Sequence, residues 1–162
     1  MREKTLNKIF LNKLDGVSHT KKIFKTLNTF NSKYKDFEKF IIDFEEYLSN
    51  KINVPADDLS IQDKIFEGII YRLDNLSEHK NLVLKIYLES QKNPKFFIII
   101  NKYIHKYFNN FIRSPMDLAT AYLIYVYAFN VWIEDNNDMD KTMAAIGNSF
   151  ETLNKIKSFF NK

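Results

Sequence analysis

The chain has 162 residues, 45% of them hydrophobic and 27% charged, which is typical of one globular domain and excludes a disordered chain. It contains no cysteine, so disulfides, thiolate metal sites and thiol nucleophiles are excluded. Three glycines and three prolines are too few for many hairpins, and the composition therefore favours helices.

The net charge of +4 is distributed unevenly along the chain. Residues 1–35 hold nine Lys or Arg against two acids, Glu3 and Asp15, so this segment carries +7 and the remainder −3. A basic segment ahead of a mildly acidic body is the asymmetry expected of contact with a nucleic acid or an anionic membrane. The alternatives are a face of solvated lysines and the codon bias of an AT-rich genome.

Apolar residues recur every three or four positions along most of the chain, as they do on one face of a helix. No stretch as long as a strand shows a convincing strict alternation of apolar and polar residues. The short connections between the elements predict an all-α antiparallel bundle of about eight helices. The predicted helices cover roughly residues 3–14, 18–28, 32–52, 59–75, 77–91, 94–112, 115–134 and 138–159.

Several of these helices have recognisable start signals. Ser60 with Asp63 three residues later forms a partial capping box. Ser77 is predicted to start the following helix. Ser114 is predicted to cap a helix whose first residue is Pro115, where a proline is tolerated.

The last two predicted helices both carry apolar faces, which makes them candidates for a four-helix interface in a homodimer. The alternative is that both faces are covered within one chain. The apolar run Leu118–Ile133 is uncharged for 16 residues, whereas a membrane span needs roughly 20. It is therefore interpreted as a buried helix, and the cytoplasm is the expected location. The residues proposed for the dimer interface are Tyr127, Met143, Ile146 and Phe150.

No catalytic apparatus is recognisable, so the protein is not expected to be an enzyme. The chain has no Gly-x-Ser-x-Gly turn, and His19, His79 and His105 show no triad-like arrangement. The acidic segment 134–140 fails the spacing of a calcium loop. Within it, Asp138 and Asp140 are instead expected to cap the last helix. No metal and no cofactor is expected.

Aromatic residues with polar tips are frequent in the second half of the chain. They fit the lining of a pocket for a lipophilic or aromatic ligand, but equally an ordinary core with tyrosines at its edge. The candidate pocket residues are Tyr87, Tyr103, Tyr107, Tyr122, Tyr125 and Trp132.

Two stretches resemble a known family. Residues 61–80, IQDKIFEGIIYRLDNLSEHK, resemble the start of the regulatory domain in TetR-family proteins of alphaproteobacteria. Residues 127–135 (YAFNVWIED) and 138–146 (DMDKTMAAI) resemble the Trp-x-x-Asp junction between the last two helices of that group. Similar proteins include the TetR-fold lipid-binding accessory proteins of ubiquinone biosynthesis, the coenzyme Q accessory family. The resemblance implies a TetR-like helical bundle.

The N-terminal segment resembles the DNA-binding head of the same family. Phe30-Asn-Ser-Lys33 is similar to the junction that follows the head, and Gly16-Val-Ser18 to the turn before its recognition helix. Only 29 residues precede Phe30, fewer than the family places there. The resemblance therefore implies a shortened or degenerate helix-turn-helix head over 1–35 and a ligand-binding and dimerisation body over 36–162.

Two functions follow from the resemblance. The first is a non-enzymatic, dimeric transcriptional regulator that binds DNA. The alternative is a coenzyme Q accessory-like protein that binds an isoprenoid lipid in support of ubiquinone biosynthesis, without binding DNA. Its basic end and the C-terminal Ile156, Phe159 and Phe160 would then contact an anionic membrane peripherally. A purely structural dimer is a third option. In the first function, the residues that face DNA phosphates are Lys21, Lys22, Lys25 and Lys33.

Overall fold

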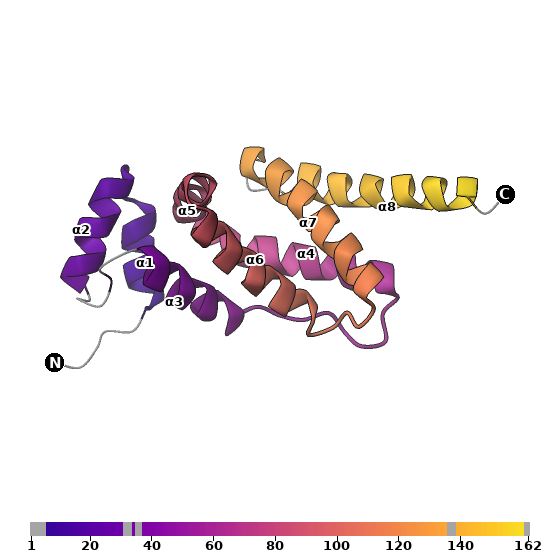
Figure 1. Cartoon of the computed structure of the whole chain (residues 1–162), viewed down its shortest axis with the longest axis horizontal. Helices are drawn as coiled ribbons and strands as arrows, with labels where there is room; N and C mark the ends of the chain where they lie inside the picture. Colours follow the sequence, from indigo (N-terminus) through magenta and orange to yellow (C-terminus); the bar gives the residue numbers. More distant parts are fainter. Residues whose placement is uncertain (1–5, 31–33, 35–36, 136–138, 161–162) are drawn as a thin grey trace. The chain divides into compact units, whose positions relative to one another are not determined.

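A computed structural model of the chain describes residues 6–30, 34, 37–135 and 139–160. Within these ranges the chain forms eight α-helices and no strand (Figure 1), which confirms the predicted all-α class. The helices are α1 (Lys8–Asp15), α2 (Thr20–Phe30), α3 (Phe37–Ser49), α4 (Ile61–Ser77), α5 (Lys80–Lys92), α6 (Pro94–Phe108), α7 (Pro115–Glu134) and α8 (Asp140–Phe160).

Two predicted start signals are confirmed by hydrogen bonds. The Ser60 hydroxyl accepts the N–H of Asp63 at 3.2 Å, which is the first half of a capping box, and it donates to the Asp63 carboxylate at 2.5 Å. The Ser114 hydroxyl accepts the N–H of Asp117 at 3.4 Å, and Pro115 is the first residue of α7. Both caps satisfy N–H groups that the first turn of a helix leaves without partners.

The prediction that Ser77 starts a helix was wrong. Helix α4 continues through Ser77, and α5 begins at Lys80 with His79 in the N-cap position. The His79 side chain makes no capping hydrogen bond. The cap comes from elsewhere in the chain, because the carboxylate of Asp15 at the end of α1 accepts the N–H of Leu82 at 2.8 Å.

Other predicted boundaries differ by a few residues. Helix α1 begins at Lys8, where the Asn7 side chain accepts the N–H of Phe10 at 3.0 Å and caps the helix, and the predicted start near residue 3 lies outside the described residues. Helix α6 ends at Phe108, and the turn that follows it carries Phe111, which is buried.

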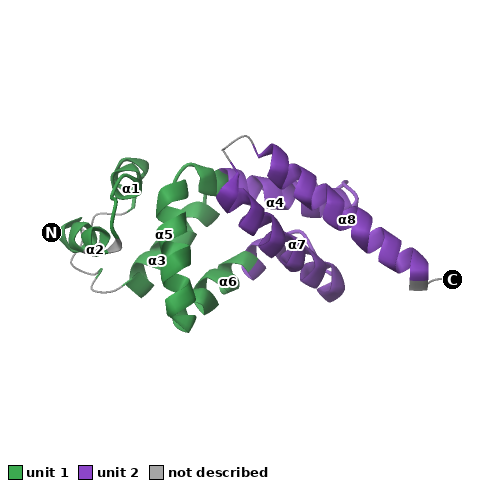
Figure 2. Cartoon of the chain, turned by 90° about the horizontal axis from the view of Figure 1, so that it is seen from above, with its two compact units in different colours: residues 1–52, 75–104 green, residues 53–74, 105–162 purple. Residues whose placement is uncertain are grey.

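The helices form two compact units (Figure 2). Unit 1 comprises residues 1–52 and 75–104, and unit 2 comprises residues 53–74 and 105–162. Helices α1 and α2, which follow the start of the predicted head over 1–35, belong to unit 1 together with α3, α5 and most of α6.

In unit 1 the core is built from one face of each of the first three helices and α5. Helix α3 contributes most of the aromatic surface, and its Phe40 ring stacks on that of Phe44 with centroids 5.9 Å apart. The spacing of three and four residues predicted from the sequence places these side chains on one face. The fully buried apolar residues of this core are Leu11, Leu14, Ile23, Leu27, Phe40, Ile41 and Leu82.

In unit 2 the core lies among α4, α7 and the first half of α8. Trp132 near the end of α7 is fully buried, and its ring lies 5.5 Å from that of Phe129. Helix α4 contributes the buried residues Ile65, Ile69 and Leu73, which are spaced four residues apart. Unit 2 therefore contains both C-terminal helices, α7 and α8, and the apolar surfaces that they carry.

Candidate nucleic-acid interface

Helices α1 and α2 are joined by a connection of four residues, Gly16–His19. The Gly16 N–H donates to the carbonyl of Asn12 at 3.2 Å and closes the last turn of α1. The carbonyl of His19 accepts the N–H of Lys22 at 2.9 Å and opens the first turn of α2. Two helices joined by a tight turn of three or four residues that includes glycine are typical of a helix-turn-helix.

Helix α2 has one apolar and one basic face. Ile23 and Leu27 are fully buried, whereas Lys21, Lys22 and Lys25 are exposed. The helix, TKKIFKTLNTF, contains no acidic residue. Since the lysines lie opposite the buried side chains, their charges face solvent and are free to approach a polyanion.

The basic face is not neutralised within the described part of the chain. No carboxylate there lies within ion-pair distance of Lys21, Lys22 or Lys25, whereas Lys39 on α3 pairs with Asp43 at 2.6 Å. Lys33, the fourth predicted phosphate contact, lies outside the described residues.

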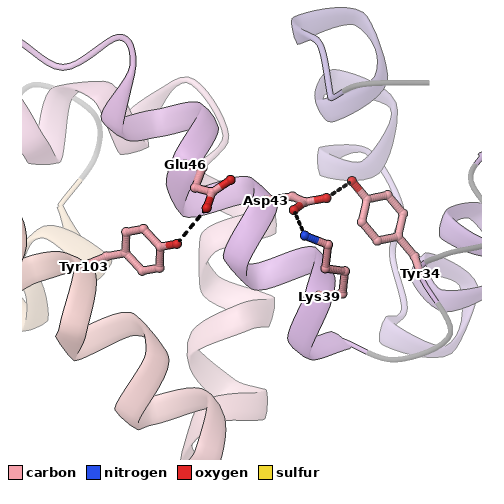
Figure 3. Close-up of polar contacts among 5 residues, drawn as sticks. All are labelled: Tyr34, Lys39, Asp43, Glu46 and Tyr103. Atoms are coloured by element: carbon pink, nitrogen blue, oxygen red, sulfur yellow. Dashed lines mark hydrogen bonds and ion pairs between the residues drawn. The ribbon is translucent and has the colours of Figure 1, made fainter. Parts of the chain in front are cut away.

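The end of α2 and the residue Tyr34 are anchored to neighbouring helices of unit 1. The Phe30 ring stacks on that of Phe10, with a centroid separation of 3.6 Å and an interplanar angle of 10°. The hydroxyl of the buried Tyr34 donates to the Asp43 carboxylate at 2.9 Å, and Lys39 contacts the other oxygen of that carboxylate (Figure 3). The first contact holds the end of α2 against α1, and the second holds Tyr34 against α3.

Two of the predicted pocket residues, Tyr87 and Tyr103, belong to unit 1 and are half-buried. The Tyr103 hydroxyl on α6 donates to the Glu46 carboxylate on α3 at 3.3 Å (Figure 3). Burial and the negative charge of Glu46 raise the pKa of Tyr103. This residue therefore ties α6 to α3.

Three predicted pocket residues lie in the core of unit 2. Tyr107, Tyr125 and Trp132 are buried, and the Tyr107 hydroxyl lies within hydrogen-bond distance of the carbonyls of Asn53 at 2.9 Å and Gly68 at 3.1 Å. Burial raises the pKa of Tyr107 well above its ordinary value of 10.0. These side chains are engaged with other parts of unit 2, as expected of core aromatics.

The remaining pocket residue, Tyr122 on α7, is half-buried and stacks on His105 with ring centroids 4.6 Å apart. Burial raises its pKa. Tyr107 and Tyr125 both contact Phe108. The ring centroid of Phe108 lies 5.4 Å from that of Tyr107 and 5.8 Å from that of Tyr125. The structure thus brings Tyr107 and Tyr125 into one cluster and distributes the six predicted residues over both units.

A groove of about 340 Å³ runs between α7 and α8 in unit 2. Its α7 side borders an exposed apolar surface, where Met116 is 76% exposed, Leu123 is 68% exposed and Tyr127 is 54% exposed. An apolar surface of this kind is typical of a site for another molecule. The groove is lined by Thr120, Leu123, Ile124, Tyr127, Asn148, Ser149, Thr152 and Leu153.

The four residues predicted for a dimer interface differ in their exposure. Tyr127 and Met143 are exposed, and Phe150 is half-buried. Ile146 is fully buried within its own chain and contributes to the core of unit 2 instead of the surface.

Helix α7 is only partly covered. The sequence predicted cover on most sides, by its own domain or by a second subunit, and five of its 20 residues are buried within the described chain. Among the described helices, α7 has the length and hydropathy of a membrane span, a criterion that a core helix of a soluble protein also meets.

The junction between α7 and α8 is held by the buried Asp135, the acidic residue of the Trp-x-x-Asp motif noted in the sequence. The carboxylate of Asp135 accepts the N–H of Thr142 at 3.1 Å and its hydroxyl at 2.9 Å. Asp138, predicted to cap α8, lies outside the described residues. No group of side chains in the described ranges is arranged to hold a metal ion.

The described structure thus offers a basic helix pair in unit 1 and an apolar helix pair in unit 2. The sequence matches no protein-family model, and neither a curated protein nor a solved structure matches it.

Proposed function

We propose that the chain is a non-enzymatic, TetR-like transcriptional regulator of the cytoplasm that binds duplex DNA through α1 and α2. The observation that carries the proposal is α2, which buries Ile23 and Leu27 and exposes Lys21, Lys22 and Lys25 after a four-residue turn. In a helix-turn-helix the second helix enters the major groove while lysines contact phosphates on either side.

A regulator of this class acts as a homodimer, and the exposed apolar surface of α7 supports pairing with a second copy. Met116, Ala119, Leu123, Val126 and Asn130 recur at alternating spacings of three and four residues, and all five are exposed. This is the spacing of the contact face in a pair of packed helices. Covering it would remove apolar side chains from water.

The experiment is a titration of fluorescently labelled duplex DNA with the full chain over a series of salt concentrations. Because lysines that neutralise phosphates release condensed counterions, the affinity is expected to fall steeply as salt increases. A chain that binds no duplex at low salt would contradict the proposal.

A second function is supported by the groove between α7 and α8. A coenzyme Q accessory-like protein would hold an isoprenoid lipid along such an apolar surface, and the exposed Ile156 and Phe159 in the last turns of α8 suit contact with a membrane. Liposome flotation with anionic vesicles and mass spectrometry of copurified lipids test it. Lipid-free protein that stays with the soluble fraction would contradict this second function.

A further inference from the structure

Helix α1 is joined to the start of α5 by polar contacts from both of its ends. The Lys8 ammonium pairs with the Glu78 carboxylate at 3.3 Å. At the other end, the Asp15 carboxylate accepts the backbone N–H of Leu82 at 2.8 Å, in the first turn of α5. Asp15 also accepts from the Asn81 amide at 3.2 Å, and its carbonyl accepts from the Lys85 ammonium at 3.1 Å. We call these contacts the α1–α5 junction; its members are Lys8, Asp15, Glu78, Asn81, Leu82 and Lys85.

These contacts combine two stabilising effects. The Asp15 carboxylate satisfies an N–H that the first turn of α5 leaves without an intrahelical partner, and its negative charge lies at the positive end of that helix. Since Asp15 is the last residue of α1 and precedes the turn to α2, the junction also fixes the position of the basic helix within unit 1.

A buried histidine sits between the two halves of the junction. His79 lies between Glu78 and the start of α5, is fully buried, and has no hydrogen-bond partner at either ring nitrogen. Its ring lies 6.2 Å from that of Phe44 and 6.3 Å from that of Tyr47, both on α3. The imidazole therefore occupies an aromatic pocket that offers the charged form no acceptor.

The charged groups around His79 come from three places in unit 1. Asp15 and Lys8 belong to α1, Glu78 precedes the histidine, and Lys51 follows α3. Burial lowers the pKa of His79 below its ordinary value of 6.5, more than the two carboxylates raise it. The folded protein accordingly holds the neutral imidazole at neutral pH.

A proton added to this imidazole requires a negatively charged partner. The carboxylates that act on it, those of Asp15 and Glu78, are already engaged with Leu82 and Lys8. If either carboxylate turns to the imidazolium, one half of the junction is lost. If neither turns, the charge stays buried without compensation, which is also unfavourable.

We propose that the α1–α5 junction is a pH-sensitive switch, in which protonation of His79 releases α1, and with it α2, from the start of α5. The opening itself does not depend on what α2 binds. Its consequence for DNA rests on the proposed function, because a freed α2 no longer presents its lysines in a fixed orientation.

The sign of the pH dependence follows from the lowered pKa. A group that prefers to be neutral in the folded state contributes stability above its unfolded pKa, and this contribution is lost as the pH falls below about 6.5. Between the unfolded and folded pKa values, the equilibrium between closed and open junction shifts by up to about tenfold per pH unit.

The test is hydrogen exchange of the Leu82 amide by NMR, measured on the full chain between roughly pH 5 and pH 8 and expressed as a protection factor. In the wild type, the protection factor is expected to fall by up to about tenfold per pH unit below about pH 6.5. The variant His79→Leu, which keeps the pocket apolar, should show no such fall. His105→Gln removes a histidine from unit 2 and should retain it.

A wild-type protection factor that depends on pH no more than that of His79→Leu would overturn the proposal. If His79→Leu does not fold, titration of the wild-type His79 ring resonance decides. A resonance that titrates near pH 6.5 with no change at Leu82 contradicts the switch, and one that titrates lower, together with loss of Leu82 protection, supports it. DNA binding is measured separately, so a junction that opens in a protein that never binds DNA would leave the switch intact and refute only the proposed function.

Discussion

Gly68 on α4 lies so close to Phe111 that a Cβ atom on the glycine would be 2.5 Å from the Cζ atom of the ring. Phe111 is itself held by neighbouring rings, with centroids 5.2 Å from that of Tyr107 and 5.9 Å from that of Phe108. The absence of a side chain at Gly68 thus allows the buried ring to pack directly on the helix.

The substitution Gly68→Ala should destabilise the protein by about 1–3 kcal/mol, because the packed Phe111 ring would have to move. The clash outweighs the gain of about 1 kcal/mol that alanine brings to a helix interior. Gly147→Ala on α8 is the matched control, since nothing lies within 4 Å of a Cβ there, and it should stabilise by up to about 1 kcal/mol. Urea denaturation of both variants measures the change in the free energy of unfolding. Equal changes would show that the close approach of Phe111 to Gly68 does not affect stability.

The hydroxyl of Tyr107 gives a second prediction. Tyr107→Phe should cost about 1–3 kcal/mol, because the carbonyls of Asn53 and Gly68 lose a donor. Since burial raises the pKa of Tyr107, the neutral phenol stabilises the folded state, and this contribution should be lost as the pH rises above about 10.

Thermal unfolding between neutral and alkaline pH checks both statements for Tyr107. The exposed Tyr127 provides the control, because Tyr127→Phe removes a hydroxyl from the surface and should leave stability unchanged. If Tyr107→Phe loses as much stability at alkaline pH as the wild type does, another residue causes that loss and the prediction for Tyr107 is wrong.

The junction between α7 and α8 gives a third prediction. Asp135→Ala should cost about 2–3 kcal/mol, because it leaves the N–H and the hydroxyl of the buried Thr142 without their acceptor. Thr142→Val removes only the hydroxyl bond and should cost less. Chemical denaturation ranks the two variants, and the reverse order would contradict the capping role of Asp135.

The eight helices could be predicted from the sequence because their apolar stripes and local caps involve residues three or four positions apart. The capping pair Ser60 and Asp63 is an example, and the Asp63 N–H bonds to the Ser60 hydroxyl as expected. The start of α5 could not be predicted, because its cap, Asp15, lies 67 residues away from Leu82 and no local signal marks a partner at that separation.

The candidate sites show the same limit. The exposed lysines of α2 follow from the helical period once Ile23 and Leu27 are placed in the core. Whether tyrosine side chains line a cavity or fill a core depends on packing between distant elements, and the sequence left both open. In the structure, Tyr107 and Tyr125 lie in the core of unit 2. Ile146, which was predicted for the dimer interface, is fully buried within its own chain.

A fourth prediction concerns the apolar surface of α7. Leu123→Glu should convert a homodimer into a monomer, because the new charge would be buried at the interface. Leu88→Glu on α5 is the matched control, since this leucine is also exposed but lies in unit 1. Sedimentation equilibrium reports the mass of each variant. A wild type that stays monomeric, or a Leu123→Glu variant that stays dimeric, would contradict the proposed interface.

The most direct test of DNA binding by α2 is the salt dependence of duplex affinity in two triple variants. One carries Lys21→Gln, Lys22→Gln and Lys25→Gln on α2. The other removes the same charge from exposed positions of α8, as Lys141→Gln, Lys155→Gln and Lys157→Gln.

Fluorescence anisotropy of a labelled duplex gives the slope of log affinity against log salt for each protein. The account predicts that the slope becomes shallower by about 0.9 for every lysine removed from α2, and that it keeps its wild-type value in the α8 variant. Equal slopes in the two variants would contradict the central claim that the basic face of α2 contacts DNA.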